Sequence, residues 1–480
     1  MPDATGAGEV RRTVGLLLGA ALLTVTLALP PPPGLSVEAW RTAGVAMLMA
    51  VWWITEAAPL SATALAPLAL FPLLGVAPFR AAAAPFADPI IFLFLGGFMI
   101  GASMQRWSLH ERIGLRLISV TGASPKGLVA GFLISTAFLS MWVSNSATAM
   151  MMLPAAGAVL SLVASKSGRG QADALGVALM LSVAYGASIG GLATLVGTPP
   201  NALLAAYMAR EHGVQIGFAQ WMAFGLPVSC TMLLAAWAVI NRLYPVTAES
   251  GGAAAAIIER RASLGPMSKA EIRVSIIFML TAGAWILRPF YAQFVPGVDD
   301  SVIAITAALA LFIAPSGMDE QRRLLQWSDV ANIPWDVLLL FGGGLSLAAA
   351  ISSSGLAAWI AGSLHVLGSF HPIYIVGVAT LAMIFLTEIT SNTASSAAFL
   401  PLGGALAVAI GIDPILLAAP LALAASCAFM LPVATPPNAI VFSSGTVTIM
   451  QMARAGLWLN LIGAIVIVAF SYLFAGRLFG

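Results

Sequence analysis

Long apolar segments separated by short polar loops occupy most of the chain. Many of them have about the length of one membrane-spanning helix, which needs roughly 17 to 25 residues. These segments lie near residues 14–30, 43–58, 60–77, 89–106, 219–240, 274–290, 302–315, 333–351 and 455–476. The pattern predicts an all-α polytopic membrane protein with about eleven spans once the broken segments described below are included.

Four further apolar segments, 128–163, 175–209, 372–410 and 414–445, are too long for a single span. Each of them is interrupted near its middle by a polar or proline-rich string. Hydrocarbon offers no water to unwound backbone, so such interruptions persist where they face a cavity, an ion or a ligand. We therefore expect two re-entrant hairpins and two broken helices around a binding site.

The interrupting strings come in two matching pairs. One pair is WVSNSAT at 142–148 and TSNTASS at 390–396, and the other is GTPPNA at 197–202 and ATPPNA at 434–439. A shift of 247 positions overlays the asparagines of the first pair, and a shift of 237 overlays the second pair. The same order in each half indicates an internal duplication.

The overlay extends beyond the strings. The shift of 247 also places Phe94 on Phe341, Gly96 on Gly343 and Gly97 on Gly344. Glycine runs of this kind permit helices to pack closely.

Lysine and arginine residues in short loops indicate which loops are cytoplasmic. They cluster at 11–12, 106–126, 166–169, 242–273 and 322–323. On this orientation the N-terminus is cytoplasmic. The segment 128–163 then enters and leaves from the cytoplasm, whereas 372–410 enters and leaves from outside, so the duplication is an inverted repeat and implies alternating access.

Composition narrows the class of protein. Hydrophobic residues make up 60% of the chain and charged residues 8%, with a mean hydropathy of +0.97, whereas soluble domains carry about 25% charged residues. A net charge of +2 without a long basic run argues against a nucleic-acid partner. Arg11 and Arg12 precede the first apolar segment, and no small-residue cleavage site follows it, so we expect a retained span in a bacterial inner membrane.

The residue types in the strings suggest how a solute is bound. Hydroxyls and amides can donate hydrogen bonds to a carboxylate, while carbonyl and side-chain oxygens can ligate Na⁺. No Lys, Arg or His lies in any of the four strings. Because a buried dianion without a counter-charge is costly, an anion bound here needs co-bound sodium. Ser144 and Ser391 have no neighbouring Lys or His, which disfavours an intramembrane hydrolase, and we expect no enzyme activity.

Together with WWITEA at 52–57, the order of these strings resembles the divalent anion/sodium symporter family, which contains Na⁺-coupled dicarboxylate, citrate and sulfate carriers. The resemblance covers almost the whole chain. It implies that the substrate is bound by residues of the Ser-Asn and Thr-Pro-Pro strings: Ser144, Asn145, Ser146, Thr198, Ser391, Asn392, Thr393, Thr435 and Pro436.

The resemblance also implies two sodium sites. The first would be formed by Ser140, Ser144, Asn145 and Gly197, and the second by Thr387, Ser391, Asn392 and Ala434. A fixed scaffold and a transport domain that moves like an elevator, in a lipid-embedded homodimer, are implied in the same way.

The domain boundaries expected from this resemblance alternate along the chain. Scaffold spans occupy 1–127, 219–371 (with a cytoplasmic linker at 241–273) and the C-terminal span 455–480, and the two halves of the transport domain occupy 128–218 and 372–454. The function expected is Na⁺-coupled symport of a C4-dicarboxylate such as succinate, malate or fumarate. A dicarboxylate exchanger, or a Na⁺-coupled citrate or sulfate carrier, is the alternative.

Glu388 lies four residues before Asn392. An acid inside a membrane segment often carries a proton in transport. The other interpretation is an acid that is hydrogen-bonded to backbone or faces water, and the sequence leaves both open.

Overall fold

The chain is helical throughout the part that the structure describes. The computed structural model describes residues 3–122, 124–167, 169–245, 259, 261–318, 322–363 and 369–479. Within these ranges the one β contact is an isolated bridge between Pro315 and Arg323. Among the described residues, seven helices are long and apolar enough to cross a membrane, and several shorter apolar helices accompany them. The prediction of an all-α polytopic membrane protein is confirmed.

Each predicted span corresponds to a helix or a pair of short helices. They are α1 (Asp3–Ala28), α2 (Val37–Thr55), α3 (Leu60–Ala64) with α4 (Ala66–Leu73), α6 (Pro89–Arg106), α12 (Phe218–Leu243), α14 (Lys269–Tyr291), α15 (Asp300–Ile313), α17 (Trp335–Ser353) and α23 (Ile449–Phe470). Shorter helices join them, among them α7 (Leu109–Val120), α16 (Trp327–Val330) and α18 (Leu356–Ser363).

All four long segments are broken where the strings predicted. In the first half α8 (Pro125–Ser140) is followed by α9 (Asn145–Ser167), and α10 (Arg169–Gly191) by α11 (Pro199–His212). In the second half α19 (Pro372–Thr387) is followed by α20 (Asn392–Ala409), and α21 (Ile415–Ala425) by α22 (Pro436–Ser443).

Local chemistry accounts for where the half-helices begin. Pro199 and Pro436 are the first residues of α11 and α22, a position where the missing N–H costs nothing. The Ser391 and Thr435 hydroxyls accept hydrogen bonds from main-chain N–H groups in the first turns of α20 and α22. Each break is therefore a helix start specified by its own residues.

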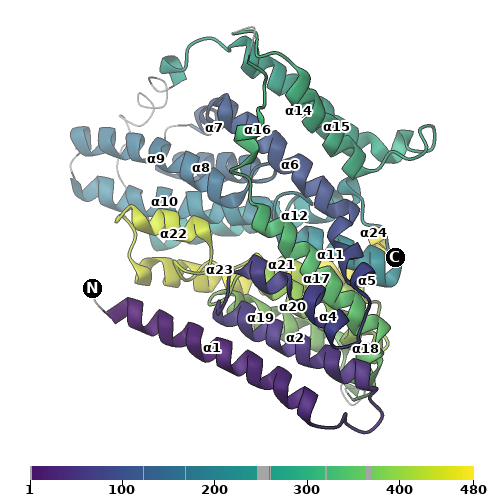
Figure 1. Ribbon diagram of the computed structural model, residues 1–480. Coiled ribbons are helices and arrows are strands. Elements are labelled where there is room, and N and C mark those ends of the chain that lie inside the picture. The colour runs from purple at the N-terminus through teal and green to yellow at the C-terminus, as the bar shows by residue number, and fades with distance from the viewer. Residues whose placement is uncertain are drawn as a thin grey trace.

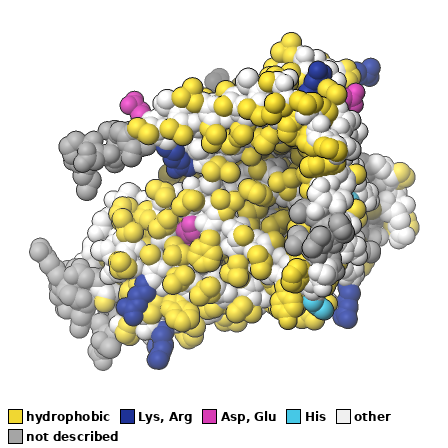
Figure 2. Space-filling view, turned by 90° about the horizontal axis from the view of Figure 1, so that it is seen from below, with side chains coloured by type: hydrophobic (Ala, Val, Ile, Leu, Met, Phe, Trp, Pro, Cys, Tyr) yellow, Lys and Arg dark blue, Asp and Glu magenta, His cyan; other side chains and the backbone are white. Residues whose placement is uncertain are grey.

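The half-helices lie between two outer pairs of spans. In Figure 1 the antiparallel helices α1 and α2 run along the bottom of the view, and α14 and α15 lie at the top, with the half-helices between them. Hydrophobic side chains cover most of the face shown in Figure 2. A surface of this kind suits lipid and not water.

Equivalent glycines of the two halves both lie in close helix contacts. A Cβ on Gly96 of α6 would come within 2.6 Å of Ala304 on α15. A Cβ on Gly343 of α17 would collide with the backbone of Ala64 on α3. The glycine runs therefore permit close packing, as predicted. Between them, Phe94 and Phe341 pack edge to face with ring centroids 5.0 Å apart.

Residues 246–258 and 260 of the predicted linker at 241–273 lie outside the described residues. Its first residues belong to α12, and its last residues to α14. Arg112 of α7 donates a hydrogen bond to the carbonyl of Gly265 and pairs with Glu271. The described end of the linker is thereby fixed against the first half.

The glycine contact gives a stability prediction. Gly343→Val places two methyl groups against the α3 backbone, and overpacking of this kind typically costs about 1–3 kcal/mol. We expect a clear fall in the thermal unfolding midpoint of the purified protein in detergent. Gly283→Val on α14, where a Cβ would meet open space, is the matched control, and an equal fall in both variants would contradict the packing argument.

Candidate functional site

In the first half, four oxygen-bearing groups meet beside the tip of the hairpin formed by α8 and α9. The Ser140 hydroxyl donates to the Ala187 carbonyl at 2.7 Å and lies 2.6 Å from Oδ1 of the Asn145 side chain. The same amide atom lies 3.2 Å from both the Ala187 and Gly197 carbonyl oxygens. The hairpin tip and the break between α10 and α11 thus contribute to one cluster.

The Asn145 amide can occupy this place in two ways. With nitrogen toward the cluster, it donates hydrogen bonds to Ser140, Ala187 and Gly197. With oxygen toward it, only the Ser140 hydroxyl can donate, and the remaining oxygens face one another. Oxygens that converge without enough donors suit a hard cation such as Na⁺, so the cluster fits the cargo ion that the sequence implied.

The second half repeats the arrangement. The Thr387 hydroxyl lies 2.6 Å from Asn392 Oδ1 and 2.9 Å from the Ala425 carbonyl. Thr387 and Asn392 correspond to Ser140 and Asn145, and Ala425 takes the place of Ala187. Neither alanine could be predicted from the sequence, because each contributes a main-chain carbonyl, which residue type does not reveal.

Two buried asparagines donate hydrogen bonds to the carbonyls of the unwound segments. Asn201 Nδ2 donates to the carbonyls of Gly191, Leu192 and Thr194 at 2.8–3.3 Å. Its counterpart Asn438 donates to two carbonyls of the second break at 3.0 and 3.2 Å. The carbonyls held by Asn201 are thus already paired, whereas the Gly197 carbonyl approaches Asn145 together with that of Ala187.

The two halves meet at their breaks. Thr198 Oγ1 of the first half lies 3.2 Å from Ser426 Oγ of the second half. In addition, α9 packs against α22, and α11 packs against α20. Helices that begin at one Ser-Asn string therefore contact helices that begin at the Thr-Pro-Pro string of the other half, which brings all four strings into one region.

The predicted site residues differ in accessibility. Thr198, Thr435 and Ala434 are buried, and Pro436 is exposed. The predicted site residues of the two Ser-Asn strings are all half-buried: Ser144, Asn145, Ser146, Ser391, Asn392 and Thr393. Ser144 accepts a hydrogen bond from the Ala147 N–H at 3.4 Å, so it caps α9, as Ser391 caps α20.

Positive potential in this region comes from backbone. Four helices begin at the strings, namely α9, α11, α20 and α22, and helix N-termini carry partial positive charge that favours an anion. Arg11 of α1 lies beside the tip of the second hairpin. Its guanidinium donates to the Ile389 carbonyl at 3.4 Å and to the Ile54 carbonyl at 2.5 Å.

The structure distinguishes the two interpretations of Glu388. The side chain is buried, and both carboxylate oxygens accept hydrogen bonds from main-chain N–H groups of the second break. The backbone-bonded interpretation therefore describes its environment. Sequence analysis could not identify these partners because they lie about forty residues away along the chain.

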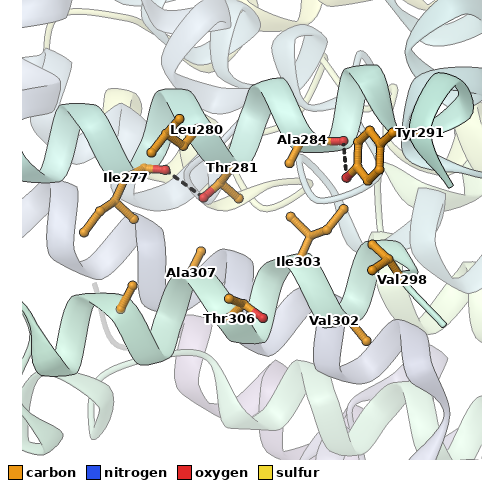
Figure 3. A pocket seen from close by; sticks show the side chains of 11 residues that line it. Ile277, Leu280, Thr281, Ala284, Tyr291, Val298, Val302, Ile303, Thr306 and Ala307 are labelled. Atoms are coloured by element: carbon orange, nitrogen blue, oxygen red, sulfur yellow. Dashed lines mark hydrogen bonds between the residues drawn. The ribbon is translucent and has the colours of Figure 1, made fainter. Parts of the chain in front are cut away.

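A separate cavity of about 410 Å³ lies between α14 and α15, away from the strings. Figure 3 shows aliphatic side chains of both helices directed into it, with Thr281 and Tyr291 turned to carbonyls of their own helix. The hydroxyls of Thr281, Tyr291 and Thr306 are the only polar side-chain groups in this lining, so the cavity offers few donors to a dianion. The polar region at the breaks is the better candidate.

Two kinds of comparison with known proteins bear on this site. Residues 10–479 match the family described as "Sodium:sulfate symporter transmembrane region". The chain is 40% identical over 475 residues to the "Sodium-dependent dicarboxylate transporter SdcS" of Staphylococcus saprophyticus, covering 97% of this chain and 91% of the relative. It is also 40% identical over 470 residues to the Staphylococcus aureus protein of the same name, covering 96% and 90%.

Solved structures support the fold alone. Neisseria gonorrhoeae MtrF superposes with a TM-score of 0.56 at 11% identity, covering 97% of this chain and 94% of that one. The Alcanivorax borkumensis YdaH transporter superposes with a TM-score of 0.52 at 13% identity, covering 90% and 98%. With the family match over nearly the whole length and the duplicated oxygen clusters, the chain belongs to the sodium:sulfate symporter family, that is, the divalent anion/sodium symporters.

Proposed function

We propose that this protein is a secondary active transporter that carries a C4-dicarboxylate such as succinate inward across the bacterial inner membrane together with Na⁺. The observation that carries the proposal is the pair of matching oxygen clusters, Ser140–Asn145 with Ala187 and Thr387–Asn392 with Ala425, at the starts of four half-helices. Cation and anion are then held side by side, which couples their binding electrostatically.

Dicarboxylate is preferred over sulfate or citrate because of the relatives. Those at 40% identity are named sodium-dependent dicarboxylate transporters, whereas the family name mentions sulfate. An exchanger would place a fixed cationic side chain where sodium binds, and the strings contain none. Sulfate, citrate and exchange remain the competing outcomes of the transport assay described below.

Contacts between equivalent residues support an inverted repeat. Phe94 and Phe341, which the shift of 247 overlays, touch each other, as expected when a two-fold axis passes between them. The end of α6 lies beside the segment that leads into the start of α17, since Trp107 Nε1 donates to the Leu324 carbonyl at 2.8 Å. Equivalent helices α6 and α17 are thus antiparallel, which suits alternating access.

Hydrogen bonds at the breaks suggest which helices move together. Ser229 of α12 donates to the Ile189 carbonyl, and Asn460 of α23 donates to Glu388. We therefore revise the expected boundaries and assign α12 and α23 to the transport unit with 128–218 and 372–454. The remaining spans form the scaffold of an elevator. The homodimer implied by the family stays a prediction.

Arg11 suggests which side the site faces. If the N-terminus is cytoplasmic, Arg11 lies near the cytoplasmic end of α1. Its contact with Ile389 then places the tip of the second hairpin near the cytoplasmic side of the membrane. On the other side, the Ser36 hydroxyl donates to the Ser354 carbonyl at 3.3 Å, so the loop between α1 and α2 lies beside the end of α17. We infer an inward-facing conformation.

Ion replacement tests the function directly. Uptake of labelled succinate into proteoliposomes should require external Na⁺ and should stop when K⁺ or choline replaces it, because the site supplies no other counter-charge. Unlabelled malate and fumarate should compete, whereas sulfate and citrate should compete weakly. Equal uptake in choline medium would refute the sodium-coupled proposal.

Substitution of either string asparagine tests whether the ions share a site. Asn145→Ala or Asn392→Ala removes an oxygen from one cluster and a donor beside the anion. A hydrogen bond to a charged group contributes about 1.5–3 kcal/mol, so both the Na⁺ half-saturation and the succinate KM should rise by about tenfold or more. Asn241→Ala at the end of α12 is the control, and a change in only one of the two parameters would count against a shared site.

Labelling of one exposed residue tests the conformation. Val433 lies in the second break with 81% of its surface exposed. After Cys230 and Cys427 are replaced by alanine, Val433→Cys should react with a membrane-impermeant thiol reagent from the cytoplasmic side in the absence of Na⁺ and substrate. Faster reaction from the outside would contradict the inward-facing assignment.

A further inference from the structure

Glu388 is the centre of a hydrogen-bond cluster that joins three elements. It lies immediately after α19, at the tip of the second hairpin. Oε1 accepts from the N–H groups of Phe429 and Met430 at 2.8 and 2.9 Å, and Oε2 accepts from those of Met430 and Leu431 at 3.1 and 3.0 Å. Asn460 of α23 completes the set by donating to Oε1 at 2.7 Å.

These bonds satisfy three consecutive main-chain donors of the unwound segment. Without Glu388 they would face a low-dielectric interior unpaired, which is costly. The carbonyls of the same segment are held from the opposite face by Asn438, which binds the Ala428 and Leu431 oxygens. Residues 428–431 are therefore fixed from both sides.

In the first half, main-chain N–H groups of the break are paired without a charged side chain. Two of the N–H groups that correspond to residues 429–431 pair within the turn of the break, where Leu192 N–H bonds to the Ile189 carbonyl and Ala193 N–H to the Gly190 carbonyl. Met141 stands at the position that the shift of 247 gives to Glu388, and its carbonyl accepts from the Thr194 hydroxyl at 2.5 Å. The clamp by a carboxylate thus belongs to the second half alone among the described residues.

The surroundings of Glu388 supply hydrogen bonds to both oxygens of its side chain. The side chain is 3% exposed, and no ion pair within the described ranges includes it. Its two oxygens are used as acceptors by N–H groups, which stabilise a carboxylate. Asn460 lies four residues after Gly456 on α23, just as Ser229 lies four residues after Gly225 on α12. Both glycines pack directly on a break.

We propose that Glu388 is a positioning residue that holds the second cation half-site in its binding geometry before the cargo arrives. Thr387 and Asn392 belong to the hairpin, whereas Ala434 and Thr435 belong to the broken helix. Glu388 joins these two elements at residues 429–431, so the groups from both remain in register. The assignment of Na⁺ to this half-site rests on the proposed function, but the clamp itself does not.

Hydrogen exchange on the full chain in lipid nanodiscs, without Na⁺ or substrate, tests the clamp. Segment 426–435 should be protected in the natural protein. In Glu388→Gln, whose amide nitrogen would face N–H donors, exchange in this segment should accelerate by about tenfold or more, while segment 189–198 stays unchanged. Thr194→Val, which removes the neutral contact of the first hairpin, is the matched control and should leave 426–435 protected.

Transport separates positioning from general stability. Glu388→Gln should raise the Na⁺ half-saturation of uptake by several-fold, with a smaller change in succinate KM at saturating Na⁺. Glu388→Asp and Asn460→Ala keep the carboxyl group and lose part of the contacts. Their Na⁺ half-saturation should therefore lie between that of the natural protein and that of Glu388→Gln. Unchanged exchange in 426–435, or faster exchange everywhere with an unchanged Na⁺ half-saturation, would overturn the proposal.

The outcomes also distinguish the clamp from the proposed function. If local exchange responds as expected but the natural protein shows no sodium-dependent uptake, the clamp stands and the function fails. If Glu388→Gln does not fold, Asn460→Asp sets a second carboxylate against Glu388 and should loosen 426–435 by repulsion. Full protection in that variant would refute the clamp.

Discussion

Unwound backbone inside a membrane protein must find hydrogen-bond partners within the protein, and this requirement organises the whole structure. Each half breaks two helices to create helix starts, and each break exposes main-chain groups that α-helix geometry would have paired. Asn201 and Asn438 bind the carbonyls of the breaks. Gly225 and Gly456 allow α12 and α23 to pack directly on the unwound segments. The candidate site therefore lies where helices are broken, and these contacts stabilise the broken segments.

The same support explains how an anion can be held without a basic side chain. Helix starts supply a diffuse positive potential, and hydroxyl and amide groups supply directed donors. Neither is sufficient for a buried dianion. In the proposed function the oxygen clusters around Asn145 and Asn392 bind cations, so the charge that completes the site would be transported with the substrate.

The two halves of the internal duplication are similar, but their hydrogen bonds are not all the same. The contact between Ser140 and Asn145 in one half matches the contact between Thr387 and Asn392 in the other. The breaks differ, because the N–H groups of Leu192 and Ala193 pair within their own turn, whereas those of residues 429–431 pair with Glu388. A two-fold relation between the halves is thus compatible with two cation half-sites that are held together by different means.

The sequence determined much of this protein by itself. Apolar segment lengths set the spans, and paired polar strings located the breaks, since both are properties of short stretches of chain. It also predicted that Ser140 lies with Asn145 and Thr387 with Asn392, and the structure brings each pair together. Tertiary structure decided the rest: the carbonyls of Ala187 and Ala425, the partners of Glu388, and the meeting of Thr198 with Ser426. Main-chain groups look alike in every residue, and contacts between distant segments depend on packing, so no local pattern encodes them.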